Sequence, residues 1–128
     1  MDEWAAISGS LDALEAIQAD LAEVATRADD QRRQDLINLR RRLAAQIAEI
    51  GRVSQPVLMR HADAATMTEY RAKFSQMRSA AALHQADWPA VLLGEREAEY
   101  RASAQGVREA NREFVAWLRG ALGRMNKR

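Results

Sequence analysis

Apolar residues recur at intervals of three and four along most of the chain, a spacing that predicts amphipathic helices. Ser8, Gly9 and Ser10 interrupt the start of the first stripe, and either serine could act as an N-cap by accepting a hydrogen bond from a free backbone N–H. We therefore expect the first helix to begin near residue 10. Its stripe comprises Trp4, Ile7, Leu11, Leu14, Ile17, Leu21 and Val24.

Residues 29–35 contain no apolar side chain, and the stripe resumes at Leu36. Either the chain turns here, with Asp29 or Asp30 capping a second helix, or one long helix continues through solvent. We predict the turn. The alternative is three long helices that form an extended or dimeric bundle, because the protruding hairpin would need a partner.

Glycine and proline predict the remaining breaks. Gly51 can end a helix in the left-handed conformation, and Pro56, five residues later, cannot continue it. Asp87, Trp88 and Pro89 form an N-cap followed by a first-turn proline, which opens either the last helix or a short turn of helix before it, and Gly94 allows a break there. The four predicted helices cover about 10–28, 30–51, 57–86 and 89–124.

Four amphipathic helices with short connections predict an all-α fold, an antiparallel four-helix bundle formed by residues 1–128 as a single domain. The composition agrees, because alanine, leucine, glutamate and arginine are abundant and β-branched residues are scarce. At 128 residues and 48% hydrophobic, the chain is long enough to bury a core. It has no apolar stretch near the roughly eighteen residues that a spanning helix requires, so we expect no membrane association.

Charge is segregated along the chain, although the formal net charge is only +1. Residues 1–30 carry eight acids and one arginine, whereas residues 31–60 carry seven arginines and two acids. We expect the acidic first helix to lie antiparallel to the basic second one, where opposite charges fix the pairing. Three consecutive arginines, 40–42, fan around a helix and cannot face one ligand together. No nucleic-acid recognition motif accompanies them, so nucleic acid is not an expected partner.

The first residues of the chain and its excess of arginine over lysine suggest where the protein acts. Met1 is followed by acidic residues and no apolar run, so we expect no signal peptide. Arginine far outnumbers lysine, and with abundant alanine this is typical of GC-rich bacterial coding. We expect a bacterial, cytoplasmic protein.

Residues that could carry chemistry are few. The chain has no cysteine, which excludes thiolate metal sites, iron–sulfur clusters and cysteine nucleophiles. It also has no phosphate-binding glycine loop, nucleophile elbow or serine–histidine–aspartate arrangement. His61 and His84 are too far apart on one helix to share a metal ion. We therefore expect no enzyme activity and no cofactor.

His61 is the one candidate for a signalling function. Histidine phosphotransfer domains are helical bundles, but in them a lysine and a glycine usually follow the phosphoacceptor, whereas Ala62 and Asp63 follow here. The competing interpretation is a surface or partly buried histidine without a special role.

Asn111 lies where the last stripe expects an apolar residue. A single asparagine in a core often fixes helix register or oligomeric state, and this is the role we predict. The alternatives are a bond to a buried backbone group or a place at the edge of the bundle.

The densest apolar cluster outside the stripes comprises Trp88, Val91, Leu92 and Leu93. It either closes one end of the core or, if exposed, binds a partner. Trp4 is the second candidate for partner binding.

From these features we expect a non-enzymatic helical module that acts through protein contacts, as an adaptor or a chaperone-like protein, and that could form a homodimer. Small helical chaperones of bacterial secretion and flagellar export are similar in size and composition. The alternative is a signalling or ligand-sensing bundle that uses His61 or an internal cavity. An exposed apolar groove near Trp88 or along one helix would favour the first function, and a polar interior with a pocket beside His61 would favour the second.

Overall fold

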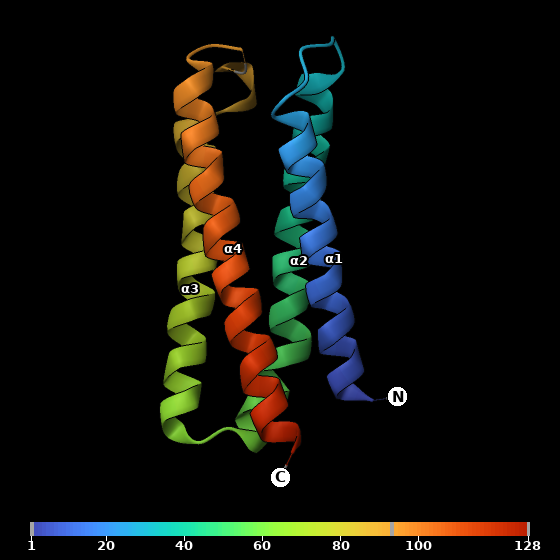
Figure 1. The fold of residues 1–128 in the computed structure, drawn as a ribbon, viewed down its shortest axis with the longest axis vertical. Coiled ribbons are helices and arrows are strands. Elements are labelled where there is room, and N and C mark those ends of the chain that lie inside the picture. Colours follow the sequence, from blue (N-terminus) through green and yellow to red (C-terminus); the bar gives the residue numbers. More distant parts are fainter. Residues whose placement is uncertain (1, 93, 128) are drawn as a thin grey trace.

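The computed structural model describes residues 2–92 and 94–127, apart from the side chain of Val91. These residues form four long helices and one short 3-10 helix, arranged as an antiparallel bundle (Figure 1). The predicted all-α fold and four-helix bundle are confirmed. In chain order the elements are α1 (Glu3–Val24), α2 (Arg32–His61), α3 (Ala64–Asp87), η1 (Ala90–Leu92) and α4 (Glu97–Asn126).

Helix α1 begins well before the predicted start near residue 10. Asp2 is its N-cap, and the Asp2 carboxylate accepts a hydrogen bond from the backbone N–H of Trp4 at 2.9 Å. The Ser10 hydroxyl does not cap the helix but donates to the carbonyl of Ile7 at 2.7 Å. The serine therefore bonds to the helix's own backbone, which lets the helix continue through Gly9.

The chain turns between α1 and α2, as predicted, so the alternative of three long helices is not adopted. Helix α1 ends at Val24, earlier than the predicted residue 28. The turn is braced by Arg27, whose guanidinium lies 2.8 Å from the carboxylates of both Asp29 and Asp35.

Helix α2 continues through Gly51 and Pro56 to His61, so the predicted break between 51 and 57 is wrong. Proline leaves the carbonyl four residues earlier without its donor. That residue is Arg52, and both it and Pro56 lie on the exposed side of α2. Gly51 is needed for packing, because a β-carbon there would lie only 3.2 Å from the ring of Phe74.

The other two predicted helices also shift. Helix α3 starts after Asp63, whose carboxylate accepts from the backbone N–H of Thr66 at 2.7 Å. The predicted helix over 89–124 begins only at Glu97. Before it, the chain passes through η1 and reverses at Gly94, which has a φ of +100°, and at Arg96, which has a φ of 49°.

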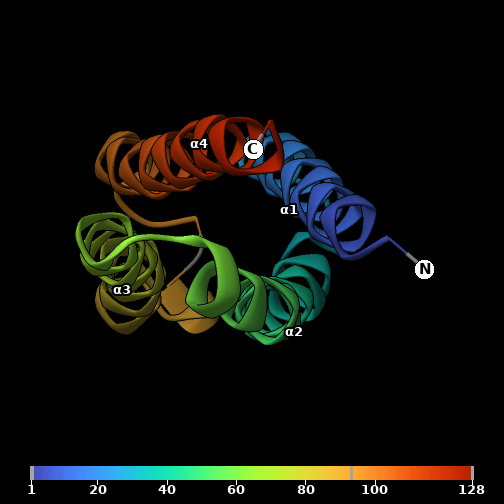
Figure 2. The same cartoon turned by 90° about the horizontal axis from the view of Figure 1, so that it is seen from below.

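The bundle consists of two closely packed hairpins, α1 with α2 and α3 with α4, which touch each other less extensively. Figure 2, viewed along the bundle, shows the helices in the ring order α1, α2, α3, α4. The looser contacts run along two seams, one between α1 and α4 and one between α2 and α3.

The apolar core has two parts. The larger part fills the half of the bundle that holds the chain termini and includes Leu11, Leu58, Met77 and Phe114. A small cluster of Val24, Leu36 and Leu39 lies near the turn between α1 and α2. Polar side chains occupy the space between these two parts of the core. The candidate ligand site lies in this polar space.

Candidate functional site

Trp88, from the predicted apolar cluster, lies at one end of the bundle as the C-cap of α3. The Trp88 ring is half-buried and meets Tyr100 edge-on, with ring centroids 5.8 Å apart, while the guanidinium of Arg96 lies 5.3 Å above the indole. Leu92 is 38% exposed. Leu93 and the side chain of Val91 lie outside the described residues. Trp88 therefore packs against Tyr100 at this end of the bundle, and its role in partner binding stays a prediction.

Trp4 and His61 meet at the opposite end. Their ring centroids are 5.2 Å apart, and Nε2 of His61 lies 3.5 Å from a carboxylate oxygen of Glu3. Glu3 also pairs with Arg60. Trp4 is half-buried against the main core, whereas the His61 side chain is 43% exposed. These residues join the start of α1 to the end of α2, and His61 lines neither of the seam grooves nor the polar cavity described below.

The predicted pairing of opposite charges is only partly between α1 and α2. Arg42 lies 3.7 Å from Asp20, and Arg60 pairs with Glu3. The acidic middle of α1 pairs instead with α4, where Arg119 reaches carboxylates at 2.7 and 2.6 Å. Those two carboxylates belong to Asp12 and Glu15.

Asn111 is 2% exposed and faces the seam between α1 and α4. Its Nδ2 donates to the carbonyl of Val107 at 2.8 Å, so the amide bonds to the backbone of its own helix. Its Oδ1 is buried and has no hydrogen-bond partner among the described residues. The seam holds a groove of about 360 Å³, to which Leu14, Gln18 and Val115 also contribute. Whether Asn111 fixes the register stays a prediction.

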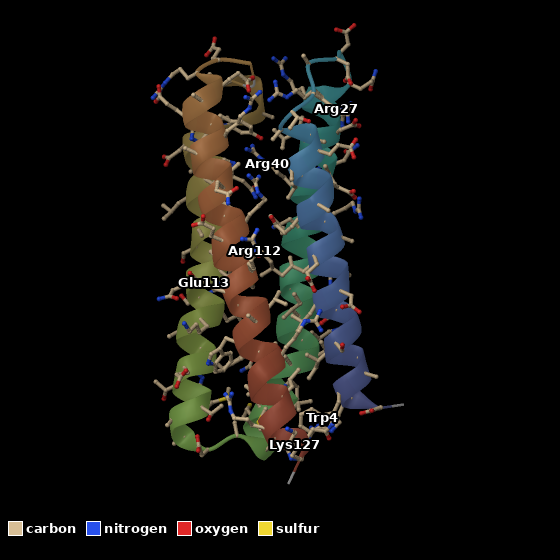
Figure 3. All side chains as sticks on the ribbon, in the orientation of Figure 1. Trp4, Arg27, Arg40, Arg112, Glu113 and Lys127 are labelled. Atoms are coloured by element: carbon tan, nitrogen blue, oxygen red, sulfur yellow. The ribbon has the colours of Figure 1, made fainter. Side chains whose placement is uncertain are left out.

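A small cavity of about 30 Å³ lies inside the bundle, next to that groove. Arg40 enters it from α2, and Figure 3 shows Arg40 in the space between the two hairpins. Burial lowers the pKa of the guanidinium, and no described carboxylate pairs with it. Its Nη2 is buried and has no hydrogen-bond partner within the described part of the chain. The other polar residues lining the cavity are Gln18, His84, Gln85, Tyr100 and Arg108.

His84 is the titratable neighbour of Arg40. Its Nδ1 lies 2.7 Å from the hydroxyl of Ser103, and its ring packs against Tyr100 with centroids 5.6 Å apart. Burial, aided by the positive charge of Arg40, lowers the pKa of His84 from 6.5 to about 4. The ring is therefore neutral at pH 7, which avoids a second positive charge beside the guanidinium.

The seam between α2 and α3 holds a mainly apolar groove of about 530 Å³. Leu43, Ile47 and Phe74 supply its larger apolar side chains. Among residues 2–92 and 94–127, the charged residues that line it are Arg52 and Arg78, and no acid does. The small residues along it are Ala44, Ala48, Gly51, Ala81 and Ala82.

Sequence reasoning missed Arg40, His84 and the two seam grooves. A signal was present, because polar residues occupy positions on or beside the buried stripes. Arg40 lies one turn after Leu36 and one turn before Leu43, and His84 follows Ala81 by three residues. The grooves were not predictable, because they depend on how far the two hairpins stand apart.

Other kinds of site find no support in the described residues. Within 2–92 and 94–127, no group of three histidine or acidic side chains is placed to hold a metal ion. No helix in this part of the chain combines the length and the apolar character needed to cross a membrane. No family model matches the chain, and neither a curated protein nor a solved structure is significantly similar to it.

Proposed function

We propose that this protein is a non-enzymatic interaction module, an adaptor or chaperone-like protein, that binds an amphipathic helix of a partner protein between α2 and α3. The observation that supports this function is the groove of about 530 Å³ along that seam. Amphipathic helices dock into apolar grooves through side chains spaced three and four residues apart.

The shape of the groove suits a helix. Ala44, Ala48 and Ala82 form an open row of short side chains, so a partner helix can approach the backbones of α2 and α3 closely. Phe74 lies deeper and is fixed by an edge-on contact with Phe114, with centroids 5.7 Å apart. An apolar side chain of the partner helix would therefore contact the ring of Phe74, which Phe114 holds in place.

The charge of the groove defines the partner further. Arg78 lies 5.7 Å above the Phe74 ring and has no carboxylate partner among the described residues. Arg52 is bound to Glu49 on the same helix at 2.5 Å. Since Arg52 already has an acidic partner, Arg78 is the cation left to meet the partner helix, which should carry an acidic residue beside its apolar stripe.

The remaining expectations belong to the same proposal. The module would act in the bacterial cytoplasm, on a protein and not on nucleic acid. Self-association is the competing use of the groove. A bundle that senses a ligand through His61 has less support, because the polar interior lies beside His84 instead.

The test is a substitution inside the groove with a matched control outside it. Ala48→Glu places a negative charge in the groove, while Ala45→Glu places the same charge at an exposed position of α2 that does not line it. Proteins are captured from the native host with wild type and both variants and are quantified by mass spectrometry. We expect a partner that A48E loses by at least about tenfold and A45E retains. The partner's acidic helix, made as a peptide, should then show the same ranking in titrations.

Two results would contradict the proposal. In the first, the two variants capture the same proteins in the same amounts. In the second, sedimentation equilibrium finds a wild-type dimer that A48E dissociates, which would assign the groove to a second copy of the chain.

A further inference from the structure

Three buried polar atoms inside the bundle have no hydrogen-bond partner among the described residues: Nη2 of Arg40, Nε2 of Gln18 and Oδ1 of Asn111. They come from three different helices, α2, α1 and α4. Their residues line two neighbouring spaces: Arg40 lines the small cavity, Asn111 the α1–α4 groove and Gln18 both. Buried polar atoms in proteins are normally satisfied, so three along two adjoining spaces point to a binding site.

Arg40 determines the charge of a matching ligand. A guanidinium only donates hydrogen bonds and stays positively charged. The ionisable groups that share the cavity with it are His84, Tyr100 and Arg108, and none of them is an acid. The one acid of the adjoining groove, Glu15, is already held by Arg119 at 2.6 Å. The group complementary to Arg40 is therefore an anion from outside the chain.

Asn111 determines a second feature of the ligand. Because its Nδ2 donates to the carbonyl of Val107, the orientation of the amide is fixed and Oδ1 is left as the acceptor. An acceptor in this position needs a hydroxyl or amine donor. A simple anion, such as phosphate or acetate, does not bring that donor together with an apolar body.

We propose that the interior binds a small organic acid that carries a hydroxyl next to its carboxylate and a compact apolar body. The carboxylate accepts from Arg40 and Gln18, and the hydroxyl donates to Asn111. The body lies in the α1–α4 groove against Leu14 and Val115, where a volume of about 360 Å³ is open. The α1–α4 groove shares no lining residue with the α2–α3 groove, although the small cavity borders both, so the binding of the organic acid is tested without the proposed partner helix.

Three related probes test the two polar requirements. Mandelate has the carboxylate, the hydroxyl and an apolar ring, phenylacetate lacks the hydroxyl, and 1-phenylethane-1,2-diol lacks the charge. Binding to the full chain is followed by NMR, through the side-chain amide signals of Gln18 and Asn111. We expect mandelate to bind at least about tenfold more tightly than either analogue.

Variants of neighbouring arginines supply the control. Arg40→Met should abolish mandelate binding, whereas Arg41→Met, on the exposed side of the same helix, should leave it unchanged. R40M should also unfold at the same temperature as the wild type or higher, because it removes a half-buried cation that has no counter-charge. If R40M does not fold, Asn111→Leu tests the proposal instead. Without the acceptor for the hydroxyl, this variant should bind mandelate and phenylacetate with equal affinity.

The proposal is overturned by any of three outcomes. They are no binding of mandelate, equal binding of all three probes to the wild type, and equal loss of binding in R40M and R41M.

Discussion

His84 illustrates how the interior acts on a single side chain. Its ring is half-buried between α3 and α4, it contacts Ser103 and Tyr100, and it faces the unpaired guanidinium of Arg40. The pKa of about 4 follows from burial first and from the neighbouring positive charge second. A neutral histidine is the form that this environment stabilises, so folding and protonation of His84 oppose each other.

The stability of the protein should therefore depend on pH through His84. Unfolded His84 takes up a proton near pH 6.5, whereas the folded protein resists protonation down to about pH 4. The contribution of His84 is complete above pH 6.5 and is lost as the pH falls toward 4, by up to about 3 kcal/mol. Urea unfolding at several pH values should show this loss in the wild type and a smaller one in His84→Gln.

His61→Gln is the matched control, because the substituted side chain is exposed and leaves His84 in place. H61Q should keep the wild-type loss of stability over the same pH range. Equal pH profiles for H84Q and the wild type would refute the prediction.

At the scale of an element, α2 shows why glycine and proline misled the prediction. Both residues often end helices, yet α2 passes through both. Pro56 and Arg52, the residue whose carbonyl it leaves free, are on the exposed side, where water can satisfy that carbonyl. Gly51 provides space for the ring of Phe74 on α3. The reason for this glycine is a contact with another helix, which the local sequence does not contain.

Two glycines inside helices should respond differently to alanine. Gly9 of α1 has open space around the position of a new β-carbon, so Gly9→Ala should raise the unfolding free energy by about 0.5–1 kcal/mol through helix propensity. Gly51→Ala has the same propensity gain, but its methyl group would lie 3.2 Å from Phe74. Chemical denaturation should therefore find G51A less stable than G9A. Equal stability gains would show that Phe74 does not need the glycine.

The same distinction explains what could be predicted for the whole chain. Stripe residues such as Leu14, Ile47 and Leu118 are buried as their spacing indicates, because a stripe must face the interior of any bundle. Helix ends were less predictable. Asp2 caps a helix whose start was expected at Ser8 or Ser10, and Asp63 caps a helix whose start was expected after Pro56. The position of the polar cavity depends on which turns of the four helices lie side by side in the folded bundle. The apolar stripe of one helix does not show which turns of the other helices it will meet.

At the scale of the molecule, Arg32 connects the two hairpins at the end near Trp88. It is 8% exposed and reaches both carboxylate oxygens of Glu97 on α4, at 2.8 and 3.1 Å. It also donates to the carbonyls of Val24 and Ala25 at the end of α1, at 3.2 Å each. One side chain of α2 therefore holds α1 and α4 together, where the apolar core is small.

Removing this connection should destabilise the whole bundle. Arg32→Met removes both guanidinium hydrogen bonds to Glu97 and the side-chain donor to the carbonyls of Val24 and Ala25, and we expect a loss of about 2–4 kcal/mol in urea unfolding. Arg101→Gln is the control, because Arg101 approaches the same Glu97 at 3.9 Å but is exposed. R101Q should lower the free energy of unfolding by less than about 1 kcal/mol. A similar loss in both variants would mean that the ion pair, and not the burial of Arg32, matters.

The division into two hairpins also has a consequence for how the chain folds. Each closely packed pair, α1 with α2 and α3 with α4, consists of helices that are consecutive in the sequence. Most native contacts can therefore form before distant parts of the chain meet, and the contact order of the fold is low. Helical proteins with such local topology fold within roughly microseconds to milliseconds. Docking of the two hairpins, with Arg32 and Glu97 brought together from opposite halves of the chain, is then the natural late step.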